Sequence, residues 1–145
     1  MRKVVEFCEK PAWIGKASTT GAKGRGLAYE RKVKKLLLER FEELFEVLLG
    51  PWVRSGNLSH WEYRQFDALL VEKRRVFLIE IKLRHKNDAL TKLIEVYLPL
   101  VQKLYPRRKV IPVQICKSIP LNFPDPIVPL EKLPTLKGYQ VVLQP

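Results

Sequence analysis

Two short, strongly apolar segments separated by a charged turn constrain this sequence most. Residues 65–71 and 76–83 are rich in aliphatic, β-branched and aromatic residues, which predicts two strands. The four residues between them, Glu72 to Arg75, are few enough for a hairpin turn. We therefore expect two adjacent antiparallel strands.

Each of these predicted strands carries an acidic residue inside its apolar run, Asp67 in the first and Glu80 in the second. A buried carboxylate is unfavourable unless a cation, a metal or a proton compensates it. The hairpin can bring Asp67 near Glu80, and Lys82 shares a strand face with Glu80 because side chains alternate. These residues predict either one acidic site with a lysine beside it or a cross-strand salt bridge at the rim of the sheet.

The acidic site would favour a hard divalent cation. Carboxylate oxygens without nearby His or Cys suit Mg²⁺ or Mn²⁺ rather than zinc. Such an ion would relieve the repulsion between Asp67 and Glu80, polarise a phosphate oxygen and lower the pKa of a bound water. Lys82 would orient that water or stabilise the charge that grows on phosphorus. The chemistry implied is phosphodiester hydrolysis.

A helix is predicted over residues 27–49, because apolar residues recur at helical spacing until Gly50-Pro51. Glu30 lies on the apolar stripe, three positions before Val33, so its carboxylate points toward whatever the helix packs on. It belongs either to the acidic site or to the first turn of the helix, where it would complement the helix dipole.

The other predicted elements complete a single α/β domain. We expect a short strand over 52–55, a polar turn over 56–60, and a strand over 109–115 with an edge position or an irregularity at Pro112. A second helix should begin near Asn87 with Asp88 as its N-cap, kink at Pro99 and end at Pro106.

The expected organisation has three parts. Residues 1–26 would form a basic N-terminal arm, and residues 27–116 the catalytic core. Residues 117–145 would form a proline-rich wrap over the core, closing with a strand over 139–143. The apolar residues of this wrap, such as Ile127, Val128 and Leu130, would serve a dimer surface or cover the core.

The charge balance favours a polyanionic partner. The chain of 145 residues has 27 Lys and Arg against 15 Asp and Glu, a net charge of +12. Nucleic acid is the commonest such partner, while acidic membrane surfaces and ribosomal RNA stay open. Charges within the first ten residues interrupt any signal-peptide pattern, so a cytoplasmic protein is expected. Cys8 and Cys116 have no partner at zinc spacing and are expected as free thiols.

The order of these motifs resembles a known superfamily. Asp67 is followed across a hairpin by Glu80-Ile81-Lys82 and preceded by a helix that bears Tyr29-Glu30 after a basic, glycine-containing segment. This pattern resembles the PD-(D/E)XK, or restriction-endonuclease-like, nucleases, and within them it is most similar to the archaeal Holliday-junction resolvases. The resemblance covers about residues 21–115. It implies a restriction-endonuclease-like α/β core, a central mixed sheet flanked by helices.

The resemblance also implies a role for each matching residue. Asp67 and Glu80 would bind the metal together with the main-chain carbonyl of Ile81, and Glu30 would join them directly or through water. Lys82 would be the catalytic lysine. The implied activity is a Mg²⁺- or Mn²⁺-dependent endonuclease that acts on double-stranded or branched DNA, such as Holliday junctions, as a homodimer without membrane contact.

Contacts with the nucleic-acid backbone are expected from residues around this site, which are Lys23, Arg25, Arg31, Arg54, Ser55, Arg74, Arg84 and Lys86. Trp61 and Tyr63 would either stack on unpaired bases or be buried. Gln102 matches a position where some relatives place a residue near the metal, or it is a surface helix residue.

Two other functions stay open. The chain could be a nucleic-acid-binding module of the same fold without activity, or a nuclease that processes RNA. The acids argue against the module, because a protein that only binds has no use for carboxylates that repel its ligand. No residue separates DNA from RNA as the substrate.

Overall fold

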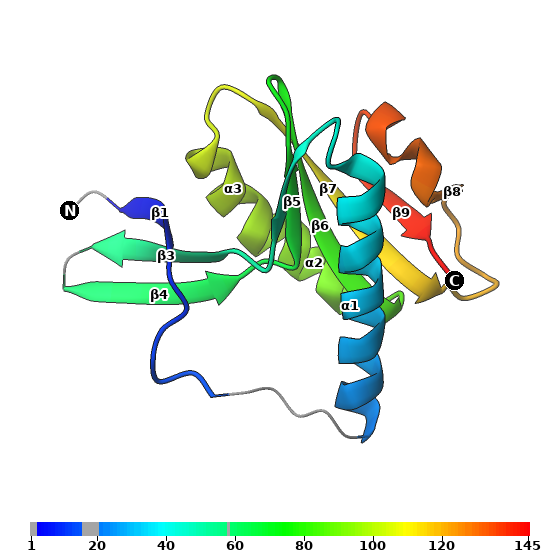
Figure 1. Ribbon diagram of the computed structural model, residues 1–145, viewed down its shortest axis with the longest axis horizontal. Helices are drawn as coiled ribbons and strands as arrows, with labels where there is room; N and C mark the ends of the chain where they lie inside the picture. Colours follow the sequence, from blue (N-terminus) through cyan, green and yellow to red (C-terminus); the bar gives the residue numbers. More distant parts are fainter. Residues whose placement is uncertain (1–2, 16–20, 58) are drawn as a thin grey trace.

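Figure 1 shows a central β-sheet with helices on both faces, in a computed structural model that describes residues 3–15, 21–57 and 59–145. The six strands lie in the order β2-β5-β6-β7-β9-β8. Their bounds are β2 Glu46–Leu49, β5 Ala68–Val71, β6 Arg75–Arg84, β7 Lys109–Ser118, β9 Gln140–Leu143 and β8 Ile127–Pro129. The pairs β2-β5 and β5-β6 are antiparallel, and the remaining pairs are parallel. The fold is therefore mixed α/β.

The two faces of the sheet pack against different helical layers, because neighbours along a strand point to opposite sides. Phe77 and Ile79 of β6 pack in one core with α1 (Gly21–Phe41) and the 3₁₀ helix η2 (Leu130–Thr135). Val76 and Leu78 pack in the other core. That second layer runs through α2 (Asn87–Lys92), the π-helical turn η1 (Leu93–Tyr97) and α3 (Leu98–Leu104).

A separate three-stranded antiparallel sheet extends to one side (Figure 1). It has the order β1-β3-β4, with bounds β1 Val4–Cys8, β3 Trp52–Asn57 and β4 His60–Gln65. The chain enters it at Gly50-Pro51 and leaves it at Phe66-Asp67. The two crossings are hydrogen-bonded to each other, since the Gly50 N–H donates to the Asp67 carbonyl at 2.9 Å and the Phe66 N–H donates to the Pro51 carbonyl at 3.0 Å.

Several predicted elements are confirmed. The β5-β6 hairpin is antiparallel as expected. The helical run over 87–104, the strand that starts at Lys109 and the final strand over 140–143 are all present. Pro99 lies at the start of α3, directly after the π-helical turn, and the kink expected there stays a prediction.

The first predicted helix is wrong at both ends. It begins at Gly21 rather than 27 and ends at Phe41 rather than 49. Residues 46–49 form β2 because their main chain pairs with Ala68–Val71, and this pairing outweighs the helical spacing of their apolar side chains. The expected arm over 1–26 likewise contains β1 and the first turns of α1.

The strand predicted over 65–71 is broken between Gln65 and Ala68, where the chain passes from one sheet to the other. The turn predicted over 56–60 is shorter than expected, since β3 continues to Asn57 and β4 begins at His60, and Leu58 lies outside the described residues.

Three further expectations need correction. Lys86, not Asp88, is the N-cap of α2, and Asp88 lies in the first turn, where its charge still complements the helix dipole. Pro112 lies in an inner strand, which tolerates it because the pairing of β7 with β9 begins only at Val113. Residues 117–145 do more than wrap the core, because β8 and β9 extend the sheet.

Candidate active site

Asp67 lies beside the central strand β6 at the point where β5 has ended. The ladder between β5 and β6 runs from Val71 opposite Val76 to Ala68 opposite Ile79. Asp67 comes one position before Ala68, so it lies on the Glu80 side of the last pair. Its Oδ2 accepts a hydrogen bond of 2.7 Å from the main-chain N–H of Ile81. The Asp67 side chain therefore accepts the hydrogen bond from β6 that the main chain of a longer β5 would accept.

The two strand carboxylates lie in surroundings that disfavour their charges. Burial is the main cause that raises the pKa of Asp67 to about 8, with the charge of Glu80 and a hydrogen bond with Glu30 adding to the rise. Glu80 is only 9% exposed. Burial also raises the pKa of Glu80, although the positive charges of Lys82 and Lys92 act against that rise. Both carboxyls would gain from a further cation.

Lys82 supplies one cation at this site. Its Nζ lies 3.1 Å from Glu80 Oε1. Burial lowers the pKa of Lys82, but the negative charges of Glu80 and Asp67 outweigh that effect and leave the pKa raised. Lys82 is therefore a firmly protonated ammonium. In the described part of the chain, Asp67 itself forms no ion pair.

Glu30 reaches the same place from the opposite helical layer. It lies on the side of α1 that packs on the sheet, next to the buried Tyr29. Its Oε2 forms an ion pair of 3.1 Å with Lys34 one turn later, and its carboxyl is one of the groups that raise the pKa of Asp67. The stripe position of Glu30 thus brings it to the acids of the strands, as the helical spacing predicted.

Among residues 3–15, 21–57 and 59–145, no three His, Cys, Asp or Glu side chains are grouped so that they could hold a metal ion. Asp67 and Glu80 offer carboxylate oxygens next to the main chain of Ile81. Glu30 is engaged by Lys34 instead.

Gln114, which the sequence analysis missed, is a fully buried polar neighbour of this site. It pairs with Glu80 in the parallel register of β6 and β7, so both side chains lie on one face. Its Oε1 lies 2.5 Å from His85 Nδ1 and accepts a hydrogen bond from Cys116 Sγ at 3.2 Å. The available signal was one amide inside the apolar run 110–116.

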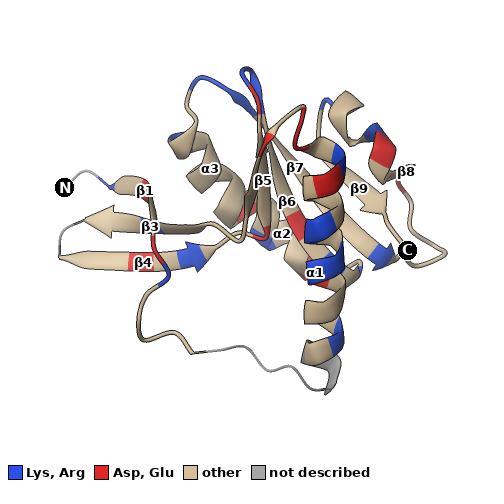
Figure 2. Ribbon diagram, in the orientation of Figure 1, with Lys and Arg blue, Asp and Glu red and all other residues tan. Residues whose placement is uncertain are grey.

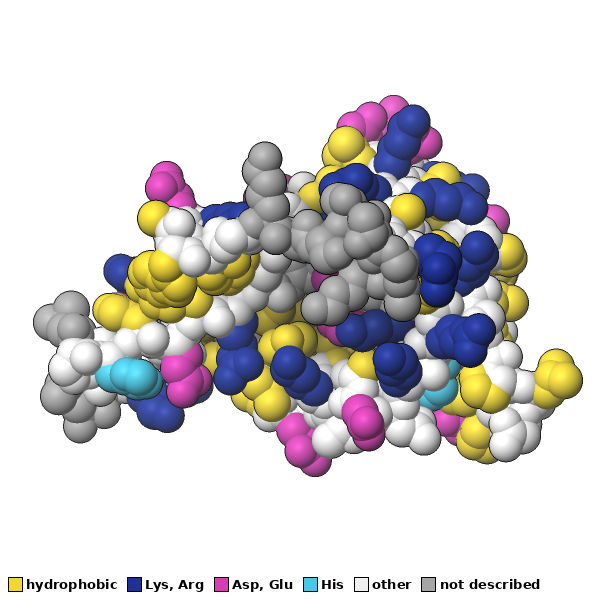
Figure 3. Space-filling view, turned by 90° about the horizontal axis from the view of Figure 1, so that it is seen from below, with side chains coloured by type: hydrophobic (Ala, Val, Ile, Leu, Met, Phe, Trp, Pro, Cys, Tyr) yellow, Lys and Arg dark blue, Asp and Glu magenta, His cyan; other side chains and the backbone are white. Residues whose placement is uncertain are grey.

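Cations from α1 and β7 line a cavity at the end of the sheet where β6 and β7 end. Arg25, Lys32 and Lys117 line about 340 Å³ between α1 and the ends of β6 and β7, together with Tyr29 and Leu83, and this cavity lies on the α1 side of the sheet, whereas Glu80 and Lys82 face the other side. Arg84 and His85 line a second cavity of about 310 Å³ at the end of β6. Figure 3 shows Lys and Arg side chains gathered on the part of the molecule away from the three-stranded sheet, which we call the basic half.

The other predicted contact residues are scattered. Arg31 and Lys86 are exposed on α1 and just before α2, near this end. Arg54 is held by Glu6, with Nη2 2.6 Å from Oε1. Ser55 lines a groove of about 250 Å³ between the three-stranded sheet and the η1-α3 layer. The side chain of Lys23 lies outside the described part of the chain.

Arg74 does not join the site. It lies in the β5-β6 hairpin, and Figure 2 shows the charged hairpin at the end of the sheet away from the start of α1. The ten residues of β6 separate that turn from Arg84 by about 30 Å at the usual strand rise. Arg74 lies six residues before Glu80, about 20 Å away at the same rise, so the expected contact at Arg74 lies at the other end of β6 from Arg84.

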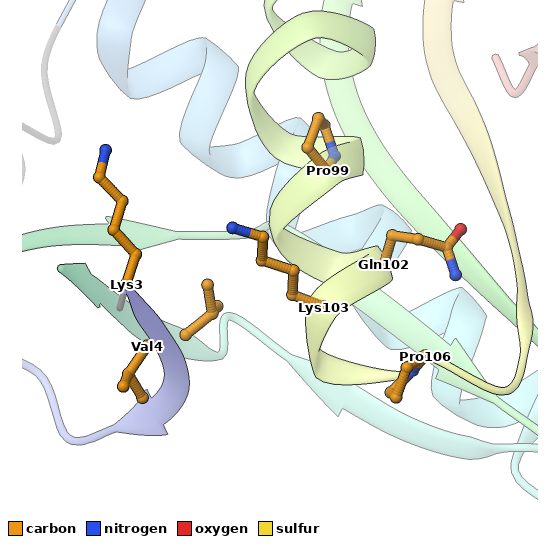
Figure 4. Close-up of a pocket in the computed structure, with 7 residues that line it drawn as sticks. Lys3, Val4, Pro99, Gln102, Lys103 and Pro106 are labelled. Atoms are coloured by element: carbon orange, nitrogen blue, oxygen red, sulfur yellow. The ribbon is translucent and has the colours of Figure 1, made fainter. Parts of the chain in front are cut away.

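Gln102 also lies elsewhere. Figure 4 shows it on α3, at a groove of about 940 Å³ between α3 and β1 that Lys3 and Lys103 also line. Its Nε2 donates hydrogen bonds to the carbonyls of Tyr105 and Arg108, at 3.3 and 3.0 Å. Gln102 thus closes the end of α3 and has no contact with the acids. Cys8 and Cys116 are free thiols, as predicted.

Comparisons with known proteins find no matching family model and no matching curated protein. None of the helices in the described residues combines the length and the apolar character needed to cross a membrane.

Proposed function

We propose that this protein is a metal-dependent endonuclease that hydrolyses phosphodiester bonds of DNA, built on a restriction-endonuclease-like core. The observation that carries the proposal is the partly buried carboxyl of Asp67, which forms no ion pair among the described residues and is held on β6 beside the Glu80–Lys82 ion pair. The raised pKa of this carboxyl means that its charged form is unfavourable in the metal-free protein, and a ligand cation would stabilise that charged form. A purely structural salt bridge would need only Glu80 and Lys82.

The order of elements supports the same core. A helix with Tyr29-Glu30 leads to a strand, then to the Ser55-Gly56 segment, and then to Asp67 and the strand with Glu80-Ile81-Lys82. This is the order that the resemblance to the resolvases implies. In addition, three layers meet at this point, since Glu30 comes from α1 and Glu80 faces the α2-α3 side of the sheet.

The donor chemistry fits Mg²⁺ or Mn²⁺, because every candidate ligand atom is an oxygen. Asp67, Glu80 and the carbonyl of Ile81 would hold the ion, and Glu30 would join through water. When bound, the ion would supply Lewis-acid activation of a phosphate and of a water molecule. Lys82 would stabilise the negative charge that grows on the phosphoryl oxygens.

The cations around the acids support a polyanionic substrate. Arg25, Lys32 and Lys117 line one cavity at the end of β6 and β7, and Arg84 lines another. Each phosphate they contact would offset the repulsion between DNA and the carboxylates. Selectivity for branched DNA, assembly as a homodimer and a place in the cytoplasm complete the proposal.

A cleavage assay tests it. Labelled four-way junction, flap, plain duplex and single-stranded DNA are incubated with Mg²⁺, Mn²⁺ or EDTA, with Asp67→Asn beside the wild type. Asn keeps an oxygen that can accept the Ile81 N–H bond but loses the charge. We expect metal-dependent cleavage by the wild type and at least a hundredfold slower cleavage by Asp67→Asn.

Each other outcome has a distinct meaning. Binding without cleavage would support the module that only binds, and cleavage of added RNA but not DNA would support the RNA nuclease. Equal cleavage by Asp67→Asn would overturn the site. Sedimentation of the free protein tests the homodimer independently of activity.

A further inference from the structure

The three-stranded sheet has one face free of the helical layers. Ser55 and Arg64 point from β3 and β4 into the groove shared with Val96 and Leu100 of the η1-α3 layer. Because side chains alternate along a strand, the residues between them face the other way. In the register of the sheet, Arg54 lies opposite Tyr63, and Gly56 lies opposite Trp61. These four residues therefore share the free face.

Aromatic side chains dominate this free face. Trp13, from the segment after β1, packs edge-on against Tyr63 with ring centroids 5.2 Å apart, and it is 73% exposed. The guanidinium of Arg54 lies over the Trp61 ring at 4.2 Å. We call Trp13, Trp61 and Tyr63, with Arg54, the aromatic platform. Figure 3 shows the hydrophobic side chains gathered over the three-stranded sheet, on the same view as the basic half.

The platform does not have the features of a simple surface covering. Gly56 opposite Trp61 adds no side chain over the indole, one face of which the Arg54 guanidinium covers. The indole of Trp13 is 73% exposed, so its ring is accessible to a partner. The ion pair between Arg54 and Glu6 holds the guanidinium in place and leaves a planar cation on the platform. Rigid aromatic faces with a cation are what single-stranded nucleic acid stacks on.

The platform is also connected directly to the candidate active site. Tyr63 is four residues and Trp61 six residues before Asp67 on the same chain. At the usual rise of a strand, these separations are at most about 13 and 20 Å. A few nucleotides of one strand could therefore span the distance from Asp67 to the platform.

We propose that the aromatic platform binds unpaired DNA bases while the basic half of the same surface holds the adjoining duplex. This inference rests on the proposed function and names its substrate class, a duplex that continues into unpaired bases, as at a fork or a flap. The cations near Arg25 and Lys117 contact phosphates without reading bases. The platform accepts any base, because every base has a stacking face.

Binding in EDTA tests the inference without cleavage. The probes are a blunt duplex and the same duplex with a short single-stranded extension, followed by fluorescence anisotropy. Trp61→Leu and Tyr63→Leu are each expected to weaken binding of the extended duplex by about tenfold and of the blunt duplex by less than about twofold. Trp61→Phe should retain most of the affinity, because it keeps an aromatic face.

The matched control is Phe7→Leu. Phe7 is an exposed aromatic residue of β1 in the same sheet, but it lies on the opposite face, against Tyr105. It should bind both probes like the wild type. A 2-aminopurine placed in the extension should be quenched by the wild type and by Phe7→Leu, and not by Trp61→Leu.

Three results would overturn the platform. The first is that Trp61→Leu weakens binding of the blunt and the extended duplex equally. The second is that Phe7→Leu weakens binding of the extended duplex as much as Trp61→Leu does. The third is that the wild type does not quench 2-aminopurine. Thermal unfolding of each variant identifies those that fail to fold, and Trp61→Phe then decides. Preferred binding of the extended duplex without any cleavage in Mg²⁺ would overturn the nuclease and leave the platform. Cleavage in Mg²⁺ without preferred binding of the extended duplex would overturn the platform and leave the nuclease.

Discussion

The carboxylate of Asp67 accepts a 2.7 Å hydrogen bond from the main-chain N–H of Ile81. The Ile81 side chain packs in the core on the α1 side of the sheet, whereas its neighbours on β6, Glu80 and Lys82, face the other layer. One contact to the strand's main chain thus places Asp67 between the two layers. This position is the reason that acids from α1 and from β6 both act on it.

The stability of the metal-free protein is expected to fall as pH rises from about 4 to about 8. The folded pKa of Asp67 is about 8, against an ordinary value of 3.8, so the fold binds the proton more tightly than the unfolded chain does. The stability that this group contributes is fully present below its ordinary pKa of 3.8 and is lost as pH rises to the folded pKa of about 8. The free energy of unfolding falls by at most about 1.4 kcal/mol for each pH unit between these two values. Urea unfolding in EDTA at several pH values measures it.

Asp67→Asn is the control for this dependence. It carries no titratable group at this position, so its free energy of unfolding should change less with pH, and at pH 8 it should exceed that of the wild type. A wild-type slope equal to that of Asp67→Asn would contradict the raised pKa.

Lys82→Gln should slow cleavage by about a hundredfold to a thousandfold, because the cation next to the reacting phosphate is lost. Its DNA affinity in EDTA should change by less than about threefold, because Lys82 would be only one of many cations that contact the DNA. Lys103→Gln removes the same charge from α3, at the groove with β1, and should cleave normally. Single-turnover rates with saturating enzyme separate the two effects, and an equal loss in both variants would argue against a catalytic role for Lys82.

Substitutions in the basic cavity should weaken DNA binding without base selectivity. Arg25→Ala, Lys32→Ala and Lys117→Ala each remove one cation that lines it. Each should lower the slope of log affinity against log salt by about 0.9 if it contacts one phosphate. Lys73→Ala and Arg74→Ala, in the hairpin at the far end of β6, are the controls. Titrations at several salt concentrations measure the slopes, and an unchanged slope in all three cavity variants would place the DNA elsewhere.

Two glycines should respond oppositely to alanine. Gly56 has φ +139°, and a Cβ there would lie 2.1 Å from the His60 carbonyl oxygen, so Gly56→Ala should destabilise the fold by about 1–3 kcal/mol. Gly26 lies within α1 with open space around its Cα, so Gly26→Ala should stabilise it by about 0.5–1 kcal/mol. Thermal unfolding of both variants gives the signs, and a neutral Gly56→Ala would contradict the tight turn between β3 and β4.

The elements that local patterns determine were predictable from the sequence. The β5-β6 hairpin needs only apolar strand formers and a short charged turn, and Glu30 needs only helical spacing to be placed on the inner side of α1. Asp67, Glu80 and Lys82 follow from these two facts. The fold class of a mixed α/β domain could be predicted on the same basis.

The features that depend on distant partners could not be predicted. Residues 46–49 continue the helical spacing of α1, and only their pairing with β5 makes them a strand. The break at Phe66 depends on a second sheet that no local pattern indicates. Gln114 is a site neighbour only because β7 lies parallel to β6 in one register. The remoteness of Arg74 follows from the full length of β6.

The two hydrogen-bonded crossings between the sheets have a mechanical consequence. Asp67 lies in one crossing, its carbonyl is tied to Gly50 in the other, and its carboxylate is tied to β6. The three-stranded sheet is thus joined to the central sheet through Asp67, the residue that carries one carboxyl of the candidate site. A change in the orientation of the three-stranded sheet would therefore also move Asp67, because both crossings between the sheets are hydrogen-bonded at this residue.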